Sequence, residues 1–234
     1  MATGIIYVLH GRRNKLPKAN IQLLRDFIET TGTPACIGFL EGKQLTLEDG
    51  LRQLQEQVDH IIIAPVLLFA ATHVKQDIPR RVLATVSPDV SLTFLKPLAT
   101  TIAVYDFLRD QISDALAENP ERPVLLIAHG TPHYNEPYTQ LKAIAEHLED
   151  DLGVTVRCAN YIGHHLIQNV VKPDSEPLIV QRLFLTDGRL ANRIRDRVTA
   201  IQPDSIFLPT LEDHQVITQA LQERLNAVNQ VSSN

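Results

Sequence analysis

Short apolar runs alternate with amphipathic segments along the 234 residues of this chain. The longest apolar run covers residues 61–71, which are too few to span a membrane and include Pro65. A short continuous run of this kind is typical of a strand buried on both faces, as the strands of parallel sheets are. The run gives way to a polar cluster that begins at His73. Ligands of open α/β sheets bind at the carboxyl ends of strands, so this cluster is a candidate site.

Predicted strands and helices alternate through the first half of the chain. We expect further strands at residues 5–9, 35–40 and 90–95, and helices at 16–30, 47–58, 78–86 and 101–117. The helical segments repeat apolar residues at helical spacing, and Pro79 falls in a first turn, where proline is tolerated. This alternation predicts an α/β fold with a parallel sheet and helices on both of its faces.

The same pattern starts again after a polar, proline-containing break at residues 119–123. The run 124–128 ends at His129-Gly130, just as the first predicted strand ends at His10-Gly11. The later strands are repeated by the runs 154–161, 178–185 and 206–209. We therefore predict an internal duplication of one α/β unit. Residues 1–119 would form an N-terminal unit that carries the active site, and residues 120–234 a diverged C-terminal repeat.

The two repeats differ in their chemistry. When Ile78 is aligned with Ile194, His73 and Asp77 correspond to Arg189 and Arg193, and the end of the second strand, Glu41, has no acidic counterpart in 160–162. Only the histidine after the first strand is present in both repeats. The N-terminal repeat holds the fuller set of titratable groups, so we place the chemistry there.

Three of these groups, His10, Glu41 and His73, each follow a predicted strand of the N-terminal repeat. The carboxyl ends of parallel strands meet at one edge of a sheet, so we expect the three side chains to converge. Two imidazoles suit a borderline divalent metal such as Fe²⁺, Co²⁺ or Ni²⁺ and leave coordination positions open. A neighbouring carboxylate can accept a proton or add an oxygen ligand.

Simpler interpretations of the same residues stay open at this point. A histidine at a strand end is often a capping or solvent-facing residue, and Asp77 could be a first-turn acid favoured by the helix dipole. Arg12, Arg13 and Lys15 could form a solvated loop. The pair His164-His165 follows a strand of the C-terminal repeat and could be an accessory to the same cleft.

Other classes of protein are disfavoured by composition and motifs. The net charge of −5 and the absence of tryptophan argue against a nucleic-acid-binding protein. No Gly-rich phosphate loop and no GxSxG nucleophile elbow occurs. A His-Gly pair after the first strand is also found in histidine phosphatases, but their preceding arginine is replaced by Leu9. No signal peptide or membrane span is visible, and we expect a cytoplasmic location without membrane partners.

Three segments together resemble the sirohydrochlorin chelatase family in its two-repeat, long form. They read LHGRRN from Leu9, GFLE from Gly38, and PVLLFAATHVKQDIP from Pro65. The resemblance is strongest over about the first 100 residues. Two positions depart from the family pattern: Arg12 replaces a small or hydroxyl residue, and Thr72 replaces a glycine. These departures affect loop shape and substrate contacts more than the histidines.

The resemblance implies two similar α/β units that face each other across a tetrapyrrole cleft. It implies insertion of a divalent metal, with Fe²⁺ favoured and Co²⁺ possible, into sirohydrochlorin without ATP and without a cofactor beyond the substrate metal. His10 and His73 would hold the metal, and Glu41 would accept pyrrole protons. The substrate's carboxylates would be bound by basic residues of the first loop and of the turn after the third strand, namely Arg12, Arg13, Lys15, Lys75, Arg80 and Arg81.

Two expectations complete this interpretation. Two repeats already form a two-sided cleft, so we expect a monomer. The alternative function is a non-catalytic carrier or regulator that binds metal or tetrapyrrole in a retained cleft.

Overall fold

The computed structural model describes residues 2–11, 18–173 and 176–231. It contains two four-stranded parallel sheets with the same strand order, β2-β1-β3-β4 and β6-β5-β7-β8. The strands are β1 (Thr3–Gly11), β2 (Ala35–Glu41), β3 (His60–Pro65), β4 (Ser91–Phe94), β5 (Val124–Ala128), β6 (Val156–Asn160), β7 (Ile179–Arg182) and β8 (Ile206–Phe207). The predicted α/β class with two similar parallel-sheet units is therefore confirmed.

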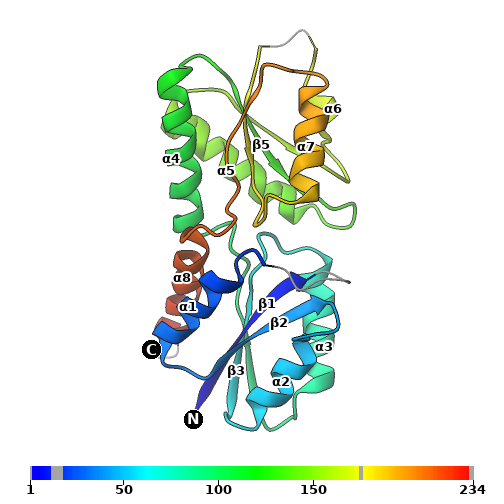
Figure 1. Cartoon of the computed structure of the whole chain (residues 1–234), viewed down its shortest axis with the longest axis vertical. Helices are drawn as coiled ribbons and strands as arrows, with labels where there is room; N and C mark the ends of the chain where they lie inside the picture. The colour runs from blue at the N-terminus through cyan, green and yellow to red at the C-terminus, as the bar shows by residue number, and fades with distance from the viewer. Residues whose placement is uncertain (1, 12–17, 174–175, 232–234) are drawn as a thin grey trace. The chain divides into compact units, whose positions relative to one another are not determined.

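The helices of each sheet lie on both of its sides (Figure 1). Those around the first sheet are α1 (Ile21–Thr31), α2 (Leu47–Gln55), α3 (Ile78–Thr85), which directly follows a π-helical turn η1 (His73–Asp77), and α8 (Val216–Val231). Those around the second are α4 (Ile102–Glu118), α5 (Glu136–Leu152), α6 (Ile167–Val170) and α7 (Arg189–Thr199). No described helix is long and apolar enough to cross a bilayer.

Alternating side chains of β1 supply both faces of the first core. Ile6 and Val8 point into a cluster with the apolar faces of α2 and α3, to which α2 contributes Leu51. Tyr7 points to the other side, where its ring meets the edge of Phe27 in α1 at a centroid distance of 5.9 Å. β1 is buried on both faces because each side of its sheet is covered by helices.

Compact units in this structure do not follow the predicted boundary between residues 119 and 120. The first unit comprises Met1–Thr101 and His214–Asn234, and the second unit comprises Ile102–Asp213. The helix at the end of each half packs in the unit of the other half: α4 packs against α5 and β7, and α8 packs against α1. Arg224 of α8 also donates to the carbonyl of Pro97 at 2.8 Å. The strands therefore repeat as the sequence predicts, but the last helix of each half belongs to the unit formed by the other half.

The third strand is shorter than the apolar run that predicts it. β3 ends at Pro65, and residues 66–71 are not part of the strand. The carbonyls of Leu67 and Leu68 accept hydrogen bonds from residues 98 and 99, at 2.9 and 3.0 Å, in place of ladder bonds to β1. The predicted strand over 61–71 is thus wrong in its second half, because an apolar run does not show which backbone partner its carbonyls find.

The two His-Gly pairs form similar turns at the ends of β1 and β5, with the glycine at a positive φ angle. Gly11 and Gly130 have φ angles of 83° and 75°. A Cβ atom at Gly11 would lie 2.1 Å from the carbonyl oxygen of Glu41, and one at Gly130 would lie 2.3 Å from that of Ile162. Only glycine allows the first and second strands to come this close, so the His10 backbone is fixed beside the end of β2.

Arg81 in α3 fastens three elements of the first unit together. Its Nε and Nη2 atoms donate to both carboxylate oxygens of Glu48 in α2 at 2.5 Å, and its Nη1 atom donates to the carbonyl of Leu40 in β2 at 2.8 Å. The hydrogen bonds from Arg81 hold the pKa of Glu48 below its ordinary value. The expectation that Arg81 binds substrate carboxylates is not supported, because its guanidinium is already bound within the protein.

The substitution Gly11→Ala should destabilise the first unit strongly. It adds both the cost of a left-handed φ, about 1–2 kcal/mol, and a clash with the backbone of Glu41. Gly32→Ala is the matched control, since Gly32 also has a left-handed φ of 61° but nothing within 4 Å of an added Cβ. Urea denaturation should show a clearly larger loss for Gly11→Ala. Equal losses in the two variants would contradict the proposed close approach.

The substitution Glu48→Gln should lower the free energy of unfolding by about 1–3 kcal/mol at neutral pH, because it breaks a charge-assisted bidentate bond. The folded pKa of Glu48 is depressed, so its stabilisation is present above the unfolded pKa of about 4.3 and is lost as the pH falls through the folded value. The difference from wild type should therefore shrink at acidic pH. Glu29→Gln, at an exposed position of the same unit, serves as the control in urea denaturation at each pH.

Candidate functional site

Two of the predicted site residues, His10 and His73, meet at the carboxyl edge of the first sheet. His10 is the penultimate residue of β1, and His73 opens the π-helical turn that follows β3. These strands are direct neighbours, with Val8 in register with Pro65. The two imidazole rings lie with their centroids 4.7 Å apart and their planes at 89°. The predicted convergence of the two histidines is thus observed.

The Nδ1 atom of each imidazole faces an oxygen atom. In His73 it lies 2.8 Å from Oδ2 of Asp77, four residues later in the same turn. In His10 it lies 3.3 Å from the carbonyl oxygen of Gly11. A carbonyl and an ionised carboxylate can only accept, so the ring proton of each neutral imidazole belongs on Nδ1. The Nε2 atoms then carry the lone pairs that a metal ion requires.

Glu41 ends the neighbouring strand β2, where it is in register with Gly11. The backbone of Glu41 is therefore adjacent to the turn that carries His10. Within the described residues, no three His, Cys, Asp or Glu side chains form a group that could hold a metal ion. The edge of the sheet thus carries two imidazoles, with a glutamate at the end of the adjoining strand. The role of Glu41 as a proton acceptor stays a prediction.

The predicted basic residues have different outcomes. Arg12, Arg13 and Lys15 lie outside the described residues. Lys75 and Arg80 are exposed on the turn and helix that follow β3, and Nη2 of Arg80 lies 3.9 Å from Oδ1 of Asp77. One interpretation of Asp77 from the sequence was a first-turn acid of the following helix. The side chain of Asp77 makes no capping hydrogen bond to α3. Its contact with His73 was not predicted, although the four-residue spacing of the two could have indicated it.

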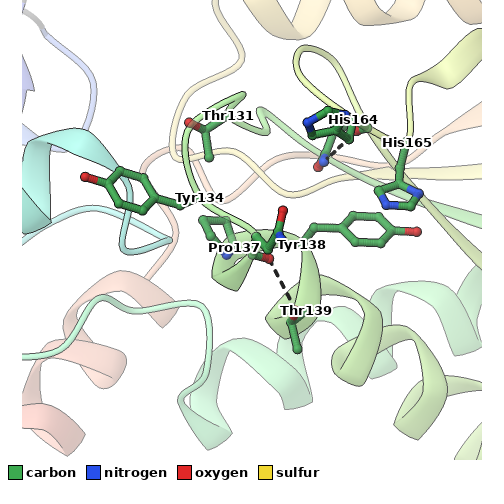
Figure 2. Close-up of a pocket in the computed structure, with 9 residues that line it drawn as sticks. Thr131, Tyr134, Pro137, Tyr138, Thr139, His164 and His165 are labelled. Carbon is green, nitrogen blue, oxygen red and sulfur yellow. Dashed lines mark hydrogen bonds between the residues drawn. The ribbon is translucent and has the colours of Figure 1, made fainter.

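A polar pocket of about 250 Å³ lies within the second unit, beyond the ends of β5 and β6. It is lined by Thr131, Tyr134, Asn135, Pro137, Tyr138, Thr139, Asn160, His164 and His165. Figure 2 shows the ring of Tyr138 flat against that of His165, with a centroid distance of 3.8 Å and an interplanar angle of 2°. Burial raises the pKa of Tyr138 to about 12, so its hydroxyl stays protonated. His164 and His165, named as accessories, thus belong to a pocket of the second unit.

The strand of the second unit that corresponds to β3 ends in a different kind of side chain. Arg182 at the end of β7 is 1% exposed and donates to Oδ1 of Asp187 at 2.8 Å and to the carbonyl of Leu208 at 3.2 Å. Burial lowers its pKa, and the carboxylate of Asp187 opposes that effect. Arg182 is in register with Ile127, as Pro65 is with Val8, so this buried cation corresponds to Pro65 at the end of β3. Sequence patterns gave no sign of it.

Comparison of the sequence with known proteins matches one family model and several curated relatives. The CbiX family model matches residues 4–115. Sirohydrochlorin ferrochelatase from Bacillus subtilis (strain 168) is 29% identical over 136 residues, which are 56% of this chain and 52% of that protein. Sirohydrochlorin cobaltochelatase from Sulfurisphaera tokodaii is 28% identical over 120 residues, which are 48% of this chain and 93% of that protein. In these alignments the chain spans about half the length of the ferrochelatases it matches.

Solved structures resemble the chain over nearly its whole length. SirB from Bacillus subtilis with Fe³⁺ has a TM-score of 0.82 at 24% identity, with 97% of this chain and 95% of that chain covered. CbiX, described as the terminal enzyme for biosynthesis of siroheme in denitrifying bacteria, has a TM-score of 0.68 at 14% identity, with 97% and 99% covered. Residues 4–115 thus match the CbiX family model, and the chain has the fold of the sirohydrochlorin chelatase SirB.

Proposed function

We propose that this chain is a sirohydrochlorin chelatase, which inserts a divalent metal into sirohydrochlorin without ATP. The observation that carries the proposal is the pair of imidazoles, His10 and His73, whose ring centroids lie 4.7 Å apart at the carboxyl edge of the first sheet. Both belong to the part of the chain that matches the CbiX family model. The relatives named above as ferrochelatase and cobaltochelatase act on the substrate that we assign here.

The chemistry of metallation suits this pair. Insertion exchanges two pyrrole N–H protons for one M²⁺ ion, so the protein must hold the metal weakly and accept protons. Two neutral imidazoles provide soft enough ligands for Fe²⁺ or Co²⁺ and leave most of the coordination sphere to water and to the incoming macrocycle. In this proposal His10 and His73 hold the metal, and Glu41 accepts protons as they leave the pyrroles.

Charge complementarity supports a polyanionic small substrate. Sirohydrochlorin bears several carboxylates, and the exposed cations Lys75 and Arg80 follow the imidazole pair along the chain. Charge-assisted bonds to such groups would orient the macrocycle over the metal. Arg12, Arg13 and Lys15 are assigned the same role from their charge and from their place after His10.

We favour Fe²⁺ as the metal and keep Co²⁺ as the alternative. The cobaltochelatase relative from Sulfurisphaera is covered over 93% of its length by about half of this chain, so it corresponds to one repeat. SirB, recorded with Fe³⁺, matches both repeats. The two-repeat arrangement therefore favours iron, although a related SirB structure is recorded with cobalt. Imidazole ligands accept either ion.

A second candidate function is a non-catalytic carrier or regulator that binds metal or tetrapyrrole. The observation in its favour is the second repeat, where Arg189 and Arg193 stand at the positions of His73 and Asp77. One copy of the site has thus already lost its imidazole while the fold was kept. A carrier would bind metal or macrocycle in proportion to the protein and would not turn over.

The substitutions His10→Ala and His73→Ala should each reduce the rate of metallation by a factor of about 100 or more, as loss of a metal ligand at a two-ligand site implies. His129→Ala is the matched control, since His129 follows the equivalent strand of the second repeat. It should retain most of the activity. Anaerobic absorbance spectroscopy of sirohydrochlorin with Fe²⁺ and catalytic protein measures all four proteins.

Two outcomes of that experiment would count against the proposal. A spectral change that saturates at stoichiometric protein would favour the carrier. An equal loss in His129→Ala would mean that the first repeat alone does not hold the chemistry.

The same assay with Co²⁺ in place of Fe²⁺ tests the choice of metal. We expect a larger ratio of catalysed to spontaneous rate for Fe²⁺ when the two ions are compared at equal concentration. A larger ratio for Co²⁺ would reverse the assignment of metal but would leave the chelatase assignment intact.

A further inference from the structure

We propose that Asp77 is a positioning residue that fixes the tautomer and the ring orientation of His73, so that Nε2 of His73 faces the substrate metal. This inference rests on the proposed function, because it takes His73 to be a metal ligand. Asp77 does not itself touch the metal or the tetrapyrrole in this proposal; it acts through the imidazole.

The contact that carries the inference is a single short hydrogen bond. Nδ1 of His73 lies 2.8 Å from Oδ2 of Asp77. An ionised carboxylate has no proton to give, so Nδ1 must be the donor and Nε2 the free acceptor. Metal-binding histidines commonly hold their other ring nitrogen in this way, and the bond also makes the imidazole a better electron-pair donor.

The local backbone explains how the two side chains meet. His73 and Asp77 are the first and last residues of a single π-helical turn, in which the amide of Ile78 bonds to the carbonyl of His73. Turns of this kind are rare and occur frequently at functional sites. Their wider spacing sets the orientation of residues on the turn, and here the carboxylate lies against the imidazole.

In His10 the Nδ1 atom also faces an acceptor, but at a longer distance than in His73. The Nδ1 atom of His10 lies 3.3 Å from the carbonyl of Gly11, so its Nε2 atom is also left as the acceptor. The planes of the two rings stand at 89° to each other. With both Nε2 lone pairs available, the pair can offer two nitrogen ligands to one ion without a change of tautomer in either ring.

A purely structural role for Asp77 explains less. As a capping residue it would accept a hydrogen bond from the first turn of α3, and its side chain makes no such bond. In the second repeat the corresponding positions are Arg189 and Arg193, and α7 forms there as a regular helix that begins at Arg189. The fold of this segment therefore does not need the carboxylate–imidazole pair.

The neighbouring cation adds to the placement of the carboxylate. Oδ1 of Asp77, the oxygen that does not face His73, lies 3.9 Å from Nη2 of Arg80. Arg80 is mostly exposed, so its attraction is weakened by water. The two carboxylate oxygens of Asp77 thus face different partners, Oδ2 facing His73 and Oδ1 facing Arg80.

Two substitutions at position 77 test the inference. Asp77→Ala removes the acceptor, whereas Asp77→Asn keeps an oxygen acceptor without the charge. The control is Asp106→Ala, because Asp106 also pairs with an arginine three residues later in its own helix, at 3.0 Å, but faces no histidine. The tautomer of His73 is read from ¹⁵N chemical shifts of its ring in the full-length, metal-free protein. Co²⁺ alone is the probe for metal affinity, measured by calorimetry.

We expect wild-type His73 to be protonated at Nδ1 and Asp77→Ala to shift the ring toward protonation at Nε2. Co²⁺ affinity should fall about 10–100-fold in Asp77→Ala, less in Asp77→Asn, and remain unchanged in Asp106→Ala. The inference is overturned if Asp77→Ala keeps both the tautomer and the affinity of wild type, or if Asp106→Ala loses as much affinity. If wild-type protein does not metallate sirohydrochlorin, the proposed function is wrong. The tautomer of His73 and the Co²⁺ affinity of the variants would still test the role of Asp77.

Discussion

The parallel pairing of β1 with both of its neighbours is the constraint on which the candidate site depends. Residues far apart in sequence reach one edge because β2 and β3 run in the same direction on either side of β1. Gly11 allows the ends of β1 and β2 to come close together, since any side chain at this position would collide with the carbonyl of Glu41 in β2. The imidazoles of His10 and His73 are therefore brought together by backbone geometry, and their ring contact is a consequence of the fold rather than its cause.

The second repeat shows which parts of this arrangement belong to the fold and which belong to the chemistry. Its strand order and its His-Gly turn repeat those of the first. The imidazole after the third strand is absent there, and a buried arginine, Arg182, ends that strand. A desolvated cation needs internal partners, and Asp187 together with backbone carbonyls supplies them. The second repeat thus keeps the strand order and the His-Gly turn, but it has Arg189 at the position of His73 and a buried arginine at the end of the third strand.

Sequence reasoning predicted the features that follow from periodicity and missed those that depend on tertiary partners. The α/β class, the repeat of the strands and the convergence of His10 with His73 follow from apolar runs that end in polar residues at equivalent positions. The π-helical turn and the exchange of α4 and α8 between units do not, because helical periodicity shows which face is buried but not which sheet covers it. Arg80 and Arg81 are adjacent and equally basic in sequence, yet only Arg81 is held by Glu48.

Two side-chain pairs involve residues that follow β3, the Arg81–Glu48 ion pair and the His73–Asp77 hydrogen bond. The side chains of Arg81 and Glu48 are only 19% and 27% exposed. Their bidentate bond fastens α3 to α2. His73 and Asp77 are 38% and 34% exposed, so water and a metal ion can reach the imidazole while the carboxylate still orients it. Under the proposed function, this combination of a rigid base and an accessible ligand suits a site that accepts and releases its metal. Arg81 lies in α3, directly after the turn that carries His73 and Asp77, so its bond to Glu48 of α2 holds the helix that follows that turn.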